Sequence, residues 1–375
     1  MHLPEELVTA ILANVYYKNP PFSDPDYSTL AACSLVNSLW TSPAQTLLFR
    51  RIQLGVAHAF SRSLANIHNP ALLSHVRVLS VALSDKPLLR IGGGESTCPV
   101  STLVSILERC PKLYELSISS RGLFWLGLQS RSDIMAVIQT NSLSIRSLRI
   151  LECSVQSPIL YELLALFPAI QFLTLGVEIA ASPPSWTPMH NFYELSLHRT
   201  PSSEILSWLL SASEISLRIL ELRDLPSVHT QADLARHCPH IQSLRLMRYN
   251  AHTAAILRQC TNLSELVLLN VPTLISLPDL PPSLEHFAFV IQTHSASVDL
   301  RPVINAVSAL PHLRILSFVG DPQLDQIPML KSACDAKGAI MRQTTTHRFW
   351  VTEDPVMTTR FPGRRQSVSN FYLMN

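Results

Sequence analysis

The sequence predicts an α/β solenoid, in which repeated strand–helix units form a parallel, concave sheet with outer helices, preceded by a small three-helix module. Two observations support this prediction. One apolar pattern recurs through residues 76–320, whereas the first 54 residues carry apolar side chains at helical spacing instead. We therefore expect a helical module at 1–54, a solenoid at 55–320, and a C-terminal cap with a basic tail at 321–375.

The repeat is visible in near-identical segments. The segment "SLRILEC" (147–153) recurs as "SLRILEL" (216–222), and "HLRILSF" (312–318) is close to both. All three fit the template L-x-x-L-x-L, with apolar residues at its three fixed positions. The template is matched at Val76/Leu79/Val81, Leu113/Leu116/Ile118, Leu148/Leu151/Cys153, Ile170/Leu173/Leu175, Phe192/Leu195/Leu197, Leu217/Leu220/Leu222, Ile241/Leu244/Leu246, Leu263/Leu266/Leu268, Leu284/Phe287/Phe289 and Leu313/Leu316/Phe318.

The spacing of the units indicates which kind of repeat this is. From the third unit onward, successive units start 22, 22, 25, 24, 22, 21 and 29 residues apart. Leucine-rich repeats span about 20–29 residues, with one strand and one helix or 3₁₀ turn per unit. The chain thus resembles leucine-rich-repeat proteins, which implies a horseshoe-shaped solenoid. The first two gaps, of 37 and 35 residues, indicate insertions such as 85–97.

Seven cysteines occur singly, without a C-x-x-C pair. Three of them stand where the helix of a unit gives way to its strand, in "RCPKL" (109–113), "HCPHI" (237–241) and "QCTNL" (259–263). This setting favours small, buried apolar side chains over metal ligands or disulfides.

The N-terminal module is expected to contain three helices. In the first, Leu3, Leu7, Ile11 and Val15 recur every four residues, and Pro4 suits a first helical turn. The proline-rich stretch 19–27 is a loop, after which Ser28 caps the second helix. The third helix starts at about residue 41.

The module resembles the F-box, in the variant common in fungal proteins. The resemblance covers about 50 residues and rests on Leu3-Pro4, Glu6-Leu7, Ile11, the run Cys33 to Val36, Trp40 and the closing Leu48 to Arg51. It implies that the module docks on the Skp-family adaptor of a cullin–RING ubiquitin ligase while the repeats hold a protein client. The docking residues would be Leu3, Pro4, Leu7, Ile11, Leu35, Val36 and Trp40.

Two alternatives remain open at the level of sequence. The three helices can instead serve only as a cap on a stand-alone repeat scaffold, with these apolar residues packing the helices together. An RNA- or lipid-binding solenoid is disfavoured by the net charge of only +2.

Nothing in the sequence points to chemistry of its own. Phosphate-loop, nucleophile-elbow and zinc-protease motifs are absent, and "GGGES" (92–96) lacks the Lys-Ser/Thr of a phosphate loop. His237 and His240 flank Cys238 without a second ligand pair at metal spacing. We expect a non-enzymatic protein without cofactor, metal, nucleic-acid or membrane partner. Without an expected signal peptide or membrane helix, it would be cytoplasmic, nuclear or both.

The client site is expected on the concave face, where the residues between the template positions point. These residues include an apolar run that we expect to be exposed and to contact either a client or the tail of the chain itself. The expected contacts are Arg223, Arg245, Met247, Val267, Leu269, Val290 and Val319.

The segment 321–375 breaks the repeat period. Residues 325–343 suit a closing helix and a strand, and 360–370 are basic. There Arg364 and Arg365 precede Ser367, which makes that serine a candidate phosphorylation site.

Overall fold

The computed structural model describes residues 4–16, 26–54, 70–84, 97–120, 122–271, 274–291 and 298–344. The predictions for Leu3, the "GGGES" stretch, the basic tail and Ser367 lie outside the described residues. The chain divides into two compact units, and the second begins at Met189.

Three helices open the first unit: α1 (Glu5–Asn14), α2 (Tyr27–Ser34) and α3 (Ser38–Leu48). Two predicted helix starts are wrong. Helix α2 is capped by Asp26, whose carboxylate accepts a hydrogen bond from the backbone N–H of Thr29, and Ser28 lies inside the helix. Helix α3 starts earlier than residue 41, because the Asn37 side chain accepts from two backbone N–H groups of its first turn.

Five parallel strands follow in the first unit and pair in sequence order. They are β1 (Arg51–Leu54), β2 (Val78–Leu83), β3 (Glu115–Ser120), β4 (Ser147–Glu152) and β5 (Phe172–Leu175). The helices between them are α5 (Pro70–Leu73), α6 (Val100–Arg109), α7 (Leu128–Asn141) and α8 (Ile159–Leu166). Strand β1 was not part of the predicted repeat. It forms because Ile52 aligns with Leu79 of the next strand.

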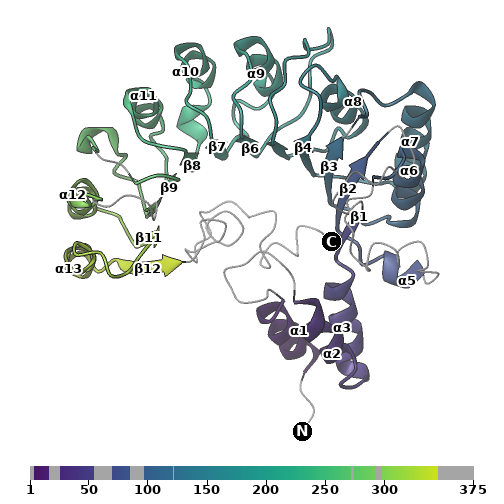
Figure 1. Cartoon of the computed structure of the whole chain (residues 1–375), viewed down its shortest axis with the longest axis horizontal. Helices are drawn as coiled ribbons and strands as arrows, with labels where there is room; N and C mark the ends of the chain where they lie inside the picture. Colours follow the sequence, from purple (N-terminus) through teal and green to yellow (C-terminus); the bar gives the residue numbers. More distant parts are fainter. Residues whose placement is uncertain are drawn as a thin grey trace. The chain divides into compact units, whose positions relative to one another are not determined.

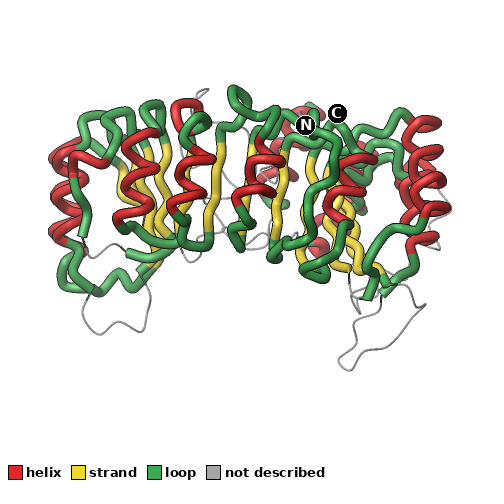
Figure 2. Tube along the Cα trace, turned by 90° about the horizontal axis from the view of Figure 1, so that it is seen from above, coloured by secondary structure: helices red, strands yellow, loops and turns green. Residues whose placement is uncertain are grey.

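The second unit continues the same alternation of strand and helix. Its strands are β6 (Glu194–Leu197), β7 (Ile219–Leu222), β8 (Ser243–Leu246), β9 (Glu265–Leu268), β10 (His286–Val290), β11 (Ile315–Val319) and β12 (Ile340–Thr344). Its helices are α9 (Ser203–Leu210), α10 (Val228–Leu234), η2 (Cys238–His240), α11 (Ala251–Gln259), η3 (Leu277–Asp279), α12 (Arg301–Ala309) and α13 (Ile327–Lys337). Helices α9 to α13 lie on one side of these strands (Figure 1), and Figure 2 shows helices and strands as separate layers. The predicted closing helix and strand are confirmed as α13 and β12.

The strand register confirms the leucine-rich-repeat solenoid. All registered pairs are parallel, and template residues of neighbouring units face each other, as Leu220 does Leu244. Leu244 in turn aligns with Leu266, and Leu266 with Phe287. All of these side chains are fully buried. Alternation along each strand therefore points the template residues into a core shared with the helices.

The predicted register of one unit is wrong. Leu148 pairs with Leu116 and Leu173, so it occupies the second template position rather than the first. The unit is Ile145/Leu148/Ile150, which is buried, whereas Leu151 and Cys153 are half-buried. The segment contains two overlapping matches to the template, and pairing with the neighbouring strands selects the earlier one.

The corner cysteines are packed as predicted. Cys110, Cys238 and Cys260 are fully buried, as is Cys334. Burial raises the pKa of the Cys110 thiol to about 11, which keeps it protonated and poorly reactive at neutral pH. Cys33, Cys98 and Cys153 are only partly buried. In the described part of the chain, no helix is long and apolar enough to cross a membrane.

Candidate protein-interaction sites

The three-helix module presents apolar side chains to solvent. Leu7 and Ile11 of α1 are 51% and 41% exposed, and Leu35 and Val36, between α2 and α3, are 85% and 60% exposed. Leu7 and Ile11 lie four residues apart and thus on one helix face. These four side chains are therefore not packed in the core of the module.

Other apolar residues of the same helices do form a core. Val8, Leu12 and Leu30 are fully buried, and Leu47 is nearly so. The turn that holds Leu35 and Val36 is fixed by hydrogen bonds, because the Thr41 hydroxyl donates to the backbone carbonyl of Ser34. The exposed residues are therefore presented by an ordered scaffold.

The remaining predicted docking residues differ in how far they are exposed. Pro4 is exposed at the start of α1, whereas Trp40 is half-buried within α3. Trp40 therefore contributes to packing of the module as well as to its surface. Leu3 lies outside the described residues.

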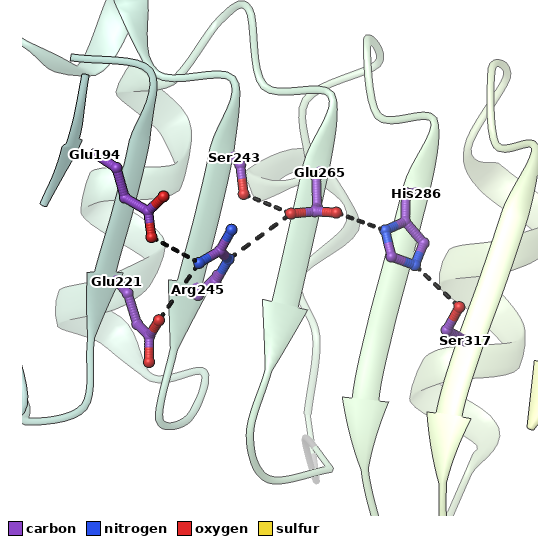
Figure 3. A network of polar contacts seen from close by, with 7 residues as sticks. All are labelled: Glu194, Glu221, Ser243, Arg245, Glu265, His286 and Ser317. Carbon is purple, nitrogen blue, oxygen red and sulfur yellow. Dashed lines mark hydrogen bonds and ion pairs between the residues drawn. The ribbon is translucent and has the colours of Figure 1, made fainter. Parts of the chain in front are cut away.

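A buried polar network crosses the second unit on the strand face opposite the template leucines (Figure 3). We call it the Arg245 network. Its members come from β6 to β11 and are Glu194, Glu221, Ser243, Arg245, Glu265, His286 and Ser317. Each of these side chains is at most 3% exposed.

Arg245 lies among three carboxylates. Its Nη1 is 3.5 Å from Glu194 and 3.4 Å from Glu221, and its Nε is 3.8 Å from Glu265. Glu265 also accepts a hydrogen bond from the Ser243 hydroxyl at 2.5 Å and lies 2.8 Å from Nδ1 of His286. The strands position these groups because equivalent residues of neighbouring units lie side by side.

The guanidinium of Arg245 is incompletely satisfied. In the described part of the chain, neither its Nε nor its Nη2 has a hydrogen-bond acceptor, although the side chain is 1% exposed. Buried donors without acceptors are rare in folded proteins.

The predicted exposed apolar run is not exposed. Val267 is fully buried and packs with Ala288, while Leu269, Val290 and Val319 are half-buried against that pair. Side chains on neighbouring strands cover one another because their rows are in register. Met247 is also half-buried.

Two predicted client residues belong to the polar network or its border. Arg245 is buried at its centre, so the expectation that it is a surface contact is wrong. Arg223 is half-buried and donates from Nε to Glu221 at 2.6 Å. The sequence-based prediction missed Glu194, Glu265 and His286. Each of them directly precedes the second template residue of its unit. Strand alternation therefore places them on the same face of the sheet as Arg245, and this position in the repeat could have identified them from the sequence.

No protein-family model matches the chain, and no curated protein sequence matches it either. Among solved structures, the leucine-rich repeat domain of APL1B aligns with 92% of this chain and 100% of its own length. The identity is 14% and the TM-score 0.23. The parallel strands in register, alternating with helices, define the fold as a leucine-rich-repeat solenoid.

Proposed function

We propose that the chain is the substrate-recognition subunit of a Skp–cullin–F-box type ubiquitin ligase. In this proposal, α1 to α3 bind the Skp-family adaptor, the repeats bind the client protein, and the chain itself is not an enzyme. The exposure of Leu7, Ile11, Leu35 and Val36 on an otherwise packed module is the observation that supports it best.

The energetics favour a partner at this module. Burying a leucine or valine side chain stabilises a complex by about 1.5–3 kcal/mol before the costs of association. The module has only about 50 residues, a size at which folded cores are marginal. Four such side chains on its surface would contribute substantially to a docking interface. Apolar residues clustered in this way are typical of interaction sites.

The test is a binding measurement between the purified full-length chain and a Skp-family adaptor. We expect the double variant Leu35→Asp/Val36→Asp to lose binding, because two carboxylates would have to be desolvated at the interface. Leu128→Asp is the matched control, since Leu128 of α7 is also 85% exposed but lies outside the module. Both proteins should melt like the parent chain, because the altered positions are exposed.

One observation favours a second candidate, a stand-alone scaffold for protein interaction in which the helices only cap the solenoid. Strand β1 follows α3 after two residues, and the Tyr27 hydroxyl donates to the backbone carbonyl of Arg51 at the start of that strand. The helices are thus joined directly to the first repeat. Undiminished adaptor binding by the double variant would refute the docking assignment, and a collapsed melt would favour the cap.

A further inference from the structure

Cationic side chains gather where the chain enters strands β2, β3 and β4 of the first unit. The segments that lead into these strands (74–77, 110–114 and 142–146) contain His75, Arg77, Lys112 and Arg146 and no acidic residue. We call these four residues the basic rim. We propose that the basic rim binds an acidic, extended segment of the client protein. The inference rests on the proposed function, because it takes the partner to be the client that the repeats hold.

The strand register places the residues of the basic rim side by side. The backbone N–H of Tyr114 donates to the carbonyl of Arg77 at 2.8 Å, and that of Arg146 donates to the carbonyl of Tyr114 at 3.0 Å. These three residues are therefore successive rungs, with about 4.8 Å between neighbouring strands. His75 and Lys112 form a second row, because each stands directly before the first template residue of its unit. Both rows lie at the edge of the sheet where these parallel strands begin.

The cations that would contact the segment are accessible and not neutralised. Lys112 and Arg146 are exposed, and within the described residues neither forms a side-chain hydrogen bond or an ion pair. The acidic residues nearest to Lys112 in the sequence are Glu108 and Glu115. Glu115 is buried and pairs with Arg149 at 3.7 Å. Glu108 forms no ion pair in the part of the chain that the structure describes.

The titration of two groups at the basic rim reports a positive local potential. Burial, and after it the nearby Arg77 and Lys112, lower the pKa of the half-buried His75. Burial, and after it the Arg50 guanidinium, lower the pKa of Arg77, whose side chain donates to backbone carbonyls. No carboxylate of the described residues offsets either shift. Since like charges close together repel, a bound anion is stabilised at this edge.

A polypeptide that carries carboxylates fits this surface better than a nucleic acid does. Proteins that bind single-stranded nucleic acids offer aromatic side chains on which bases stack, in addition to positive charge. Tyr114, the aromatic residue between Arg77 and Arg146, is 3% exposed and packs against Phe172. In an extended polypeptide, side chains on one face recur about every 6.6 Å. Acidic residues at every second position therefore reach cations on neighbouring strands.

The probe is a short fluorescein-labelled peptide of alternating glutamate and serine, titrated with the full-length chain by fluorescence anisotropy. The matched peptide carries glutamine at every glutamate. We expect the glutamate peptide to bind roughly tenfold more tightly at low ionic strength, because two or three exposed ion pairs contribute a factor of about two to five each. Added salt should reduce the difference.

Variants of the chain locate the site. The double variant Lys112→Gln/Arg146→Gln should lose most of the preference for the glutamate peptide. The control Arg248→Gln/Lys331→Gln removes the same charges from exposed positions of the second unit and should retain the preference. All four positions are exposed, so both proteins should melt like the parent chain. The two peptides on the unaltered chain test the proposal independently of the variants.

Equal binding of the two peptides would overturn the proposal. Equal loss of binding in the two double variants would also overturn it, because it would show an effect of net charge alone. Tighter binding of a fluorescein-labelled thymidine oligonucleotide than of the glutamate peptide would assign the basic rim to nucleic acid instead.

Adaptor binding is measured with the same samples. We expect the variant of the basic rim to bind the adaptor like the parent chain, and a loss would assign the rim to the adaptor and overturn its assignment to the client. Failure of the proposed function appears separately, as undiminished adaptor binding by Leu35→Asp/Val36→Asp.

Discussion

Replacing Leu244 by alanine is expected to weaken the second unit around β8. The Leu244 side chain is fully buried and aligned with Leu220 and Leu266 on either side. Removing three carbons loses roughly 2.4 kcal/mol of transfer free energy at about 0.8 kcal/mol per carbon. The cavity left behind raises the total to about 2.7–5 kcal/mol, depending on how far the neighbouring repeats collapse into it.

Hydrogen exchange measures this effect strand by strand. Because each repeat contacts mainly its neighbours, exchange should accelerate most in β7, β8 and β9, by roughly 100-fold to several-thousand-fold for the free energies above. The control Leu274→Ala removes the same atoms from a side chain that is 73% exposed, and should change exchange little. Equal effects of the two substitutions, or no acceleration in β7 to β9, would refute the assigned register.

Three further predictions test particular contacts. Leu268→Asp should unfold the repeats around β9, because it buries a charge in the core, whereas Leu269→Asp, at a half-buried position, should lower the melting temperature much less; equal melts would contradict the assignment of faces. A hydrogen bond from the Tyr249 hydroxyl holds the pKa of Asp279 below its ordinary value. This contact therefore stabilises the fold fully at pH values above the ordinary pKa of an aspartate, and the stabilisation is lost as the pH falls through the lowered pKa of Asp279. Tyr249→Phe should therefore cost about 1–2 kcal/mol in urea titrations at neutral pH and progressively less in acid; a pH-independent cost would contradict this. Gly320→Ala should destabilise by 1 kcal/mol or more, because its φ of +156° suits glycine and a Cβ there would lie 2.7 Å from another side chain; a neutral variant would show that the backbone adapts.

The face of the core could be predicted from the sequence because it depends on local alternation. The template identified Leu244 and Phe287 as buried, and the structure confirms both. The register of the third predicted unit could not be predicted in the same way. Its sequence matches the template from Ile145 and from Leu148, and only pairing with strands about 30 residues away distinguishes the two.

Strand β1 and the helix starts escaped prediction for related reasons. The strand has only four residues and is defined by its partner, since Ile52 meets Leu79 across the sheet. At the helix starts, several residues have the right chemistry to cap. Asp26 and Asn37 act as the caps because the helical turns of α2 and α3 begin directly after them. Where each helix begins depends on how the helix packs, and the residue type alone does not determine it.

The burial of Arg245 shows the limit of the same method. Alternation correctly assigns this residue to the face opposite the leucines. Its surroundings come from four strands, and the three carboxylates near it lie 20 to 51 residues away in the sequence. A sequence pattern predicts toward which face of the sheet a side chain points. It does not predict which residues from other strands bury that side chain.

The composition of this strand face bears on why the network exists. At β9 and β10 the same face is built from Val267 and Ala288, so the fold accepts apolar residues there. Replacing buried ion pairs by apolar residues of similar volume is often neutral or stabilising. The ion pairs around Arg245 are thus weak evidence for added stability, and in the described residues two guanidinium nitrogens of Arg245 have no acceptor. Removing only one member of such a network is a different case, because it leaves a buried charge uncompensated and is strongly destabilising.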